Sequence, residues 1–376
     1  MAQMAGAPGK YRENKHIQMK PNYYYISHLQ GNSGICKYSR DFYELILKDK
    51  GYIFMDSAQD IIHILSTISS RDHVHIELGI FQQKEQEILF TMLRANYRNV
   101  SVTLHDPPLL KYPQNPFRHS FLHNVSKFYD VYINRFRWKK PFLQKIKAVY
   151  VLSRRGREVL EKKYGLGNVH YLPHVIDPAQ MVRGRTADNN FIFFGFVGRN
   201  KGIGYSLKLH RHLMERFPDS HFYVVGKAMG REQRFYEALR RQYQHQVHYL
   251  GYIADEDLQQ VFRQAAFALL LFSEYRFFHP FSGSLLQSMK MGKIVLTNRV
   301  NSVEEIIEEG KNGFFLSGNL KKDAALIGDL IGKRSLQDSM RKEIYQYLLD
   351  HHSPEKVAQY LKTEPYALFN PDRQLQ

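Results

Sequence analysis

Short apolar segments alternate with amphipathic segments along most of this chain, and the alternation is clearest in its second half. Predicted strands there lie at 191–197, 221–225, 247–250, 267–272 and 294–298, and predicted helices at 204–215, 232–243, 256–265 and 285–291. Strands that alternate with helices form parallel sheets covered by helices on both faces. The sequence therefore predicts an α/β fold.

The first half repeats this pattern less regularly, with predicted strands at 23–27, 73–78, 100–105 and 148–153. Between residues 173 and 190 the pattern gives way to Pro, Asp, Gly, Arg and Asn, which is the composition of a linker. A chain of 376 residues suits two domains better than one. We predict a polar N-terminal segment at 1–20, a first domain at 21–175, a linker at 176–190, a second domain at 191–350 and a C-terminal segment at 351–376.

The composition excludes several classes of protein. Apolar residues make up 43% of the chain and charged residues 24%, as in folded globular proteins. The longest apolar stretches, such as 265–272, are too short to span a bilayer, and residues 1–20 lack the apolar core of a secretion signal. We therefore expect a cytoplasmic protein without a transmembrane segment. The single cysteine, Cys36, rules out an internal disulfide and a cysteine metal cluster.

The net charge of +17 is unevenly distributed. Residues 1–175 contain 26 Lys and Arg against 14 Asp and Glu, a net of +12. This excess predicts an anionic partner for the first half, which could be phospholipid headgroups, a phosphorylated acceptor or nucleic acid. Charge alone does not choose among them.

Three loops follow predicted strands, where open α/β sheets bind their ligands. The first contains Gly31 and Gly34 before a predicted helix, so its backbone N–H groups could approach a phosphate; a simple tight turn explains it equally well. The second carries Arg199 and Lys201, which could neutralise a leaving diphosphate or be solvated surface charges.

The third loop leads into the predicted helix at residues 285–291. Ser282, Gly283 and Ser284 form a capped helix start that could bind an anion, and Gln287 lies one turn further, where it could bind hydroxyl groups. An ordinary surface helix would have the same caps.

These segments, taken in order, resemble glycosyltransferase family 4 of the GT-B fold. The similarity rests on residues 33–35, 102–106, 198–202, 250–258, 285–293 and 303–315. It implies two Rossmann-like, doubly wound domains facing across a cleft, with a C-terminal helix within 351–376 crossing back to the first domain. It also implies a nucleotide-sugar donor in the cleft and transfer with retention of anomeric configuration, without a catalytic metal or other cofactor.

The resemblance also implies roles for single residues. His105 would contact the donor sugar, Arg199 and Lys201 would hold the diphosphate, and Gly34 would lie at the diphosphate or the acceptor. Tyr252 and Ile253 would border the base, and residues 282–284 would donate backbone hydrogen bonds to phosphate.

One departure from the family concerns its usual pair of glutamates, which falls here on His279 and Gln287. Gln287 can still form a hydrogen bond with a ribose. His279 is a harder substitution because a carboxylate accepts sugar hydroxyls there, whereas histidine is neutral or cationic.

A basic, aromatic stretch lies at residues 111–147. It has a single acid, Asp130, and its cluster of candidate surface residues consists of Arg135, Arg137, Trp138, Lys139 and Lys140. Cations mixed with aromatic rings suit a membrane interface, and they could also stack on single-stranded nucleic acid. A third interpretation buries the aromatic rings in the first domain and leaves the lysines in solvent.

The sequence thus predicts a retaining, metal-independent glycosyltransferase. The donor would be a UDP-, GDP- or TDP-sugar, and the acceptor a glycan or lipid-linked molecule of surface polysaccharide or glycolipid synthesis, near the inner face of a membrane. The alternatives are a catalytically degenerate GT-B binding or scaffold protein and, less favoured, a basic nucleic-acid-binding protein.

Overall fold

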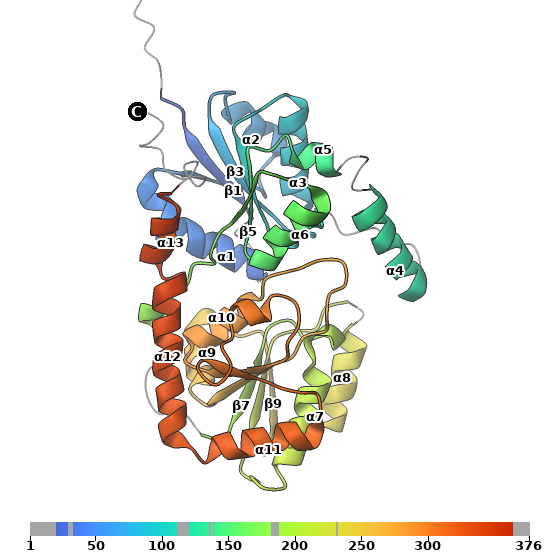
Figure 1. Cartoon of the computed structure of the whole chain (residues 1–376), viewed down its shortest axis with the longest axis vertical. Coiled ribbons are helices and arrows are strands. Elements are labelled where there is room, and N and C mark those ends of the chain that lie inside the picture. The colour runs from blue at the N-terminus through green and yellow to red at the C-terminus, as the bar shows by residue number, and fades with distance from the viewer. Residues whose placement is uncertain are drawn as a thin grey trace, which may run out of the picture.

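The computed structural model describes most of the chain. The described residues are 20–28, 33–110, 120–134, 137, 139–181, 188–230 and 232–363. They form two α/β domains, one above the other in Figure 1, each built on a parallel six-stranded sheet. This architecture confirms the predicted fold class of two Rossmann-like domains.

The sheet of the first domain has the strand order β2-β1-β3-β4-β5-β6. Its strands are β1 (Tyr23–Ser27), β2 (Ile53–Asp56), β3 (His73–Leu78), β4 (Val100–Leu104), β5 (Ala148–Val151) and β6 (Val169–Tyr171). The helices are α1 (Gly34–Phe42), α2 (Ile61–Thr67), α3 (Gln83–Arg94), α4 (Ser120–Phe128), α5 (Lys139–Leu143) and α6 (Arg154–Tyr164). From β1 the chain adds β2 on one side of the sheet and then continues with β3 on the other side. The loop after β1 therefore lies beside the crevice where such sheets bind ligands.

The sheet of the second domain has the order β12-β11-β10-β7-β8-β9. Its strands are β7 (Phe191–Phe194), β8 (Phe222–Val225), β9 (Val247–Gly251), β10 (Phe267–Leu270), β11 (Ile294–Thr297) and β12 (Gly313–Phe315). The helices are α7 (Ile203–Leu213), α8 (Glu232–Gln242), α9 (Asp255–Phe262), α10 (Gly283–Lys290), α11 (Leu320–Ile331) and α12 (Arg334–His352), and α13 (Pro354–Tyr360) follows them in the chain. Here the change of side lies between β7 and β10, so the loops after these strands face the corresponding crevice.

The C-terminal helices connect the two domains. Helix α12 runs from the second domain toward the first, and α13 lies against the first domain in Figure 1. Val357 and Leu361 are buried in the same apolar cluster as Tyr25 of β1. Where the chain crosses between domains, the His352 ring lies 2.8 Å from the His174 carbonyl oxygen, and Ile176 N–H donates to the His352 carbonyl at 2.7 Å. The two crossing segments therefore support each other.

Other contacts also join the two domains. Phe277 of the second domain packs into an apolar cluster with Leu109 and Val131 of the first. The Glu305 carboxylate accepts hydrogen bonds from the N–H groups of Arg154 and Arg155 at 2.6 and 2.8 Å, which places a negative charge at the N-terminus of α6. Among the described residues, no helix has both the length and the apolar composition to cross a bilayer.

Candidate functional site

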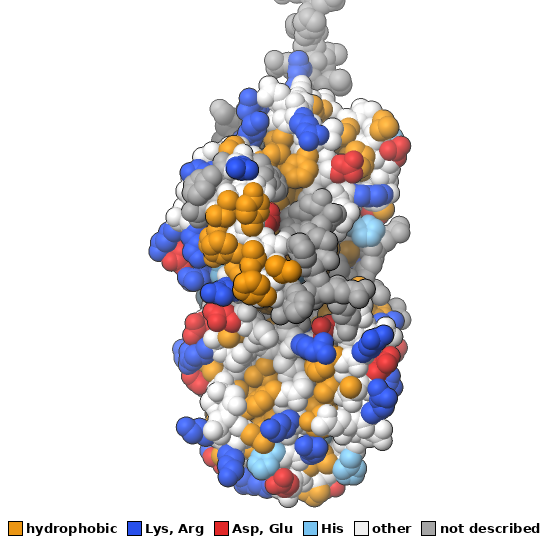
Figure 2. Space-filling view, turned by 90° about the vertical axis from the view of Figure 1, so that its right-hand side faces the viewer, with side chains coloured by type: hydrophobic (Ala, Val, Ile, Leu, Met, Phe, Trp, Pro, Cys, Tyr) orange, Lys and Arg blue, Asp and Glu red, His pale blue; other side chains and the backbone are white. Residues whose placement is uncertain are grey.

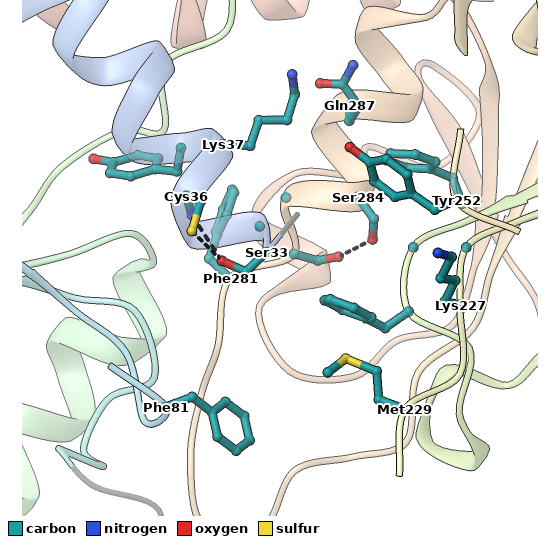
Figure 3. Close-up of a pocket in the computed structure, with 18 of the residues that line it drawn as sticks. Ser33, Cys36, Lys37, Phe81, Lys227, Met229, Tyr252, Phe281, Ser284 and Gln287 are labelled. Atoms are coloured by element: carbon teal, nitrogen blue, oxygen red, sulfur yellow. Dashed lines mark hydrogen bonds between the residues drawn. The ribbon is translucent and has the colours of Figure 1, made fainter. Parts of the chain in front are cut away.

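A cavity of about 1100 Å³ lies between the two domains and is lined by residues of both. The first domain contributes the start of α1, including Gly34 and Lys37, and the loop at Phe81. Figure 3 shows Lys37 and Phe81 on the first-domain side of this cavity and Ser284 and Tyr252 on the second-domain side. Both walls follow the carboxyl ends of parallel strands, so the cavity occupies the position at which α/β proteins bind ligands.

The N-terminus of α10 forms one wall of the cavity. Ser282, Gly283 and Ser284 all line it, as the sequence predicts for one site. The Ser282 hydroxyl does not cap the helix; it lies 3.1 Å from the Ser284 hydroxyl instead. The first N–H groups of a helix have no partner within it, and the helix dipole adds positive potential. This wall is therefore suited to an anionic group such as a phosphate.

Gln287 lies one turn further along α10 and also lines the cavity. Its side-chain amide has no hydrogen-bond partner among the described residues, although only 5% of the residue is exposed. A buried amide with unused donors and an acceptor can bind a ligand hydroxyl. The predicted position of Gln287 at the site agrees with this geometry.

Lys201 provides a cation on the wall formed by the end of β7. It ends a short 3₁₀ helix, Arg199–Lys201, and its ammonium lies over the Phe272 ring, 4.8 Å from the ring centre. Burial lowers the pKa of Lys201 to about 8, and nearby Asp106 opposes this shift. The side chain therefore remains mainly charged at neutral pH and can neutralise an anion in the cavity.

Arg199 does not line the cavity, contrary to the prediction that it shares a diphosphate with Lys201. Its guanidinium lies over the Phe235 ring of α8 at 4.5 Å, beside Glu232, and 63% of the side chain is exposed. A 3₁₀ helix has three residues per turn, so residues two apart point in directions about 120° apart. This geometry explains why one cation faces the cavity and the other faces α8.

Two glycines that the sequence analysis did not single out, Gly195 and Gly226, also line the cavity. They follow β7 and β8 and have φ angles of +126° and +143°, which side chains rarely allow. A β-carbon on Gly226 would lie 1.8 Å from the Gly195 carbonyl oxygen. The close approach of these two backbone segments forms the floor of the cavity, and only glycine permits it.

Tyr252 and Ile253 line the cavity at the end of β9, at the place predicted to border a base. The Lys227 ammonium lies 5.8 Å from the centre of the Tyr252 ring. Lys227 was missed in the sequence, although it follows the predicted strand 221–225 just as Lys201 follows 191–197. Gly34 also lines the cavity, whereas Gly31 falls outside the described residues.

His105 is placed just behind the cavity wall. It follows β4 and is 8% exposed, and the Tyr38 ring, which does line the cavity, packs edge-on against it at 5.0 Å. The His105 Nε2 atom lies 2.7 Å from a Glu77 carboxylate oxygen. Direct contact of His105 with a donor sugar stays a prediction.

Glu77 of β3 is the fully buried centre of a polar network that the sequence analysis missed. Its carboxylate accepts a hydrogen bond from the Tyr25 hydroxyl at 3.0 Å and lies within 3.2 Å of both the His75 and His105 rings. Burial pushes the pKa of Glu77 up, but the hydrogen bonds and charges of His105 and His75 outweigh burial and hold this pKa at about 2. The available signal was an acid at the end of a predicted strand, His73–Leu78, in which histidines alternate with apolar residues, because buried acids require partners.

This network predicts a pH-dependent contribution to stability. A depressed pKa means that the charge of Glu77 stabilises the fold above its ordinary value of 4.5, and that this stabilisation is lost as the pH falls toward 2. For Glu77→Gln we expect a loss of up to about 3 kcal/mol in the free energy of unfolding near neutral pH. The difference from the native chain should shrink on acidification, as measured by urea unfolding; a difference independent of pH below 4.5 would contradict the assignment.

His279 lies away from the cavity surface, unlike Gln287. Its backbone N–H donates to the Pro107 carbonyl at 2.7 Å, so it forms part of the contact between domains. Burial lowers the pKa of His279 to about 4, and the charges of Arg155 and Lys163 add to the shift. The ring is therefore neutral near pH 7, and the predicted donor-binding role for His279 has no support in this geometry.

The predicted cluster of surface cations is only partly at the surface. Lys139 is 0% exposed, and its ammonium contacts the Asp130 carboxylate at 2.7 Å and the Asp130 carbonyl at 2.8 Å. This corrects its prediction as a membrane-facing residue: a buried ammonium requires a paired acid, and Asp130 supplies it. Arg137 is exposed and Lys140 half-buried, while Arg135 and Trp138 lie outside the described residues.

Within the described part of the chain, no group of three or more His, Cys, Asp or Glu side chains is placed to hold a metal ion. Independence of a metal nevertheless stays a prediction about the reaction.

Comparison with known proteins agrees with this architecture. The family model for glycosyl transferases group 1 matches residues 181–350, slightly under half of the chain, which include the whole second sheet. Sucrose-phosphate synthase from Thermosynechococcus elongatus superimposes with a TM-score of 0.69, at 14% identity, over 95% of this chain and 99% of that chain. The chain has the GT-B fold.

Two further GT-B structures were solved with nucleotides. HepE from Anabaena, in complex with UDP-glucose, has a TM-score of 0.68 at 14% identity over 91% of this chain and 98% of that chain. TarM from S. aureus, in complex with fondaparinux, alpha-GlcNAc-glycerol and UDP, has a TM-score of 0.61 at 14% identity over 82% of this chain. The present chain spans 58% of the length of TarM. A search of curated proteins found no match to the sequence.

Proposed function

We propose that this protein is a retaining, metal-independent glycosyltransferase of the family 4 type, which transfers a sugar from a nucleoside-diphosphate sugar. The observation that carries the proposal is the convergence of Lys201, the N-terminus of α10 and Gln287 on one cavity between two Rossmann-like domains. A cation and unused helix N–H groups suit a diphosphate, and an amide suits a sugar hydroxyl. UDP and UDP-glucose bound to GT-B structures support a nucleotide ligand.

In the proposed reaction, the bond between the anomeric carbon and the diphosphate oxygen breaks while a bond from the acceptor oxygen forms on the same face of the sugar. The acceptor's proton passes to the diphosphate oxygen that leaves. Lys201 and the α10 N–H groups stabilise the negative charge that develops on the diphosphate. No protein nucleophile is required.

The acceptor would enter from the wall of the first domain, where Lys37, Arg40 and Lys84 line the cavity. These cations suit an acceptor that carries phosphate or another anionic group. We place the reaction in the synthesis of a surface polysaccharide or glycolipid, with a glycan or lipid-linked acceptor, at the cytoplasmic face of a membrane.

Binding of the donor nucleotide is the first testable consequence. A nucleoside diphosphate present at about a hundred times its Kd should stabilise the fold by about 3 kcal/mol, because it binds only the folded state. A thermal-shift screen with UDP, GDP and TDP should therefore show a raised Tm for one of them and no shift with the free nucleosides. No shift with any diphosphate would contradict a donor site.

Transfer assays with UDP-, GDP- and TDP-sugars separate the enzyme from its main alternative, a GT-B binding or scaffold protein. That alternative is favoured by His279, which replaces a family carboxylate and lies away from the cavity surface. An enzyme releases the nucleoside diphosphate from its donor by transfer or slow hydrolysis. A scaffold binds the nucleotide sugar but does not cleave it, so no nucleoside diphosphate is formed.

A further inference from the structure

Helix α4 and the π-helical turn that continues it, Tyr129–Ile133, expose an apolar stripe to solvent. Phe121 is 73% exposed, Val125 48% and Phe128 49%. Leu122, Tyr129 and Ile133 are exposed as well. The spacing from Phe121 to Tyr129 is that of one helix face, the face that a helix of a globular protein normally buries.

The opposite face of this segment is more buried than the stripe. Ser126, Lys127 and Asp130 are half-buried, and Val131 is buried. Asp130 pairs with the buried Lys139, and the Tyr164 hydroxyl donates to the Val131 carbonyl at 2.6 Å. The segment is therefore held to the domain at Asp130 and Val131, while the apolar stripe stays exposed.

The exposed side chains form a contiguous apolar patch on the first domain, just above its boundary with the second (Figure 2). Val131 belongs to the small apolar cluster that contains Ile80. The next residue, Phe81, is 74% exposed and lines the cavity. The apolar surface thus lies near the side of the cavity lined by the first domain, and contiguous exposed patches of this kind mark interaction sites.

The charge of the chain indicates the kind of surface that covers this patch. The net charge is +17, most of it in the first half, and the only acid between residues 120 and 134 is Asp130, which pairs with Lys139. Association of two such cationic chains through this face would be opposed by repulsion, whereas an anionic lipid surface would attract it. Phe121, Phe128 and Tyr129 are the large aromatic residues that favour the interfacial layer of a bilayer.

We propose that the α4 stripe of Phe121, Leu122, Val125, Phe128, Tyr129 and Ile133 docks this protein on an anionic bilayer, with these side chains inserted among the lipid headgroups and acyl chains. Docking would turn the first-domain side of the cavity toward the membrane. That consequence, a cavity presented to a lipid-linked acceptor, rests on the proposed function, whereas the binding itself does not.

Vesicle flotation tests the docking without donor or turnover. The native chain should float with vesicles of phosphatidylcholine mixed with phosphatidylglycerol and only weakly with phosphatidylcholine alone. The triple variant Phe121→Ser, Val125→Ser, Phe128→Ser should lose binding to the mixed vesicles by about tenfold or more, because it removes buried apolar area from the bound state. The matched control Ile53→Ser, Ile62→Ser removes exposed apolar side chains from another part of the domain and should bind like the native chain.

Thermal stability and the response to nucleoside diphosphates show whether the triple variant is still correctly folded. The triple variant should keep the native Tm and its response to nucleoside diphosphates, since the substituted side chains are exposed and outside the cavity. Equal binding of the triple variant and the native chain to mixed vesicles would overturn the proposal, as would a native chain that binds neither vesicle. A native dimer in light scattering that the triple variant dissociates would also overturn it, because a second copy would then cover the stripe.

Discussion

Replacing Lys201 with alanine should lower kcat/KM for sugar transfer by about a hundred- to a thousandfold, or about 3 to 4 kcal/mol of transition-state stabilisation. Lys201 is a cation on the cavity wall, and no metal is invoked to neutralise the leaving diphosphate. The loss should appear mainly in kcat, because the charge develops as the bond to the diphosphate breaks. Circular dichroism and thermal unfolding should show that the variant remains folded.

Arg199 provides a matched control two residues away. Its side chain packs over Phe235 and contacts Glu232 outside the cavity. Arg199→Ala should therefore change kcat/KM by less than about threefold. Similar losses in the two variants would contradict the assignment of Lys201 as the single diphosphate-binding cation of this loop.

The pH dependence of kcat/KM gives a second test of the role of Lys201. Because this pKa is about 8 in the free protein, kcat/KM should fall on the alkaline side with a midpoint near that value as the cation is lost. The alkaline fall should be absent from the residual activity of Lys201→Ala.

Replacing Gly226 with alanine should have the largest effect on stability, a loss of about 4 kcal/mol or more in the free energy of unfolding. Its β-carbon would collide with the Gly195 carbonyl oxygen, a backbone atom that cannot move without displacing the end of β7. The φ angle of +143° adds strain. Urea unfolding monitored by circular dichroism measures the loss.

Gly230→Ala is the matched control for Gly226→Ala. Gly230 also has a positive φ, +54°, but a β-carbon there would meet nothing within 4 Å. We expect a cost of only about 1 kcal/mol, which is the strain of the left-handed backbone. Equal costs at both glycines would show that the close contact between the ends of β7 and β8 is not rigid.

The strands β7 and β10 of the second domain could be predicted because they are almost entirely buried. Phe191–Phe194 and Phe267–Leu270 are short continuous apolar runs, which parallel sheets require. The edge strands β2, β6 and β12 were missed. Ile53–Asp56 is partly exposed, and Val169–Tyr171 and Gly313–Phe315 have only three residues each, so none of them gives a clear apolar run.

The residues of the site could be predicted where they lie in the loop or helix start that follows a strand. Lys201, Gln287 and residues 282–284 were found because they occupy loops and helix starts at the carboxyl end of the second sheet. The direction of a single side chain was not predictable, since Arg199 and Lys201 look equivalent in sequence.

In the basic, aromatic stretch at residues 111–147, too, the sequence did not predict which side chains are buried. Lys139 and Phe121 appear in one mixture of cations and aromatic rings, yet the lysine is buried and the ring exposed. The ion pair with Asp130 keeps Lys139 inside the domain. Such pairing between residues of different elements cannot be predicted from the periodicity of the sequence.

The central claim is that the cavity between the domains binds the diphosphate of a nucleotide sugar. A crystal structure of the protein with UDP tests it most directly. We expect the diphosphate within hydrogen-bond distance of the Lys201 ammonium and the first N–H groups of α10, with the base beside Tyr252 and Ile253. A nucleotide bound elsewhere, or a diphosphate contacting Arg199 rather than Lys201, would contradict the claim.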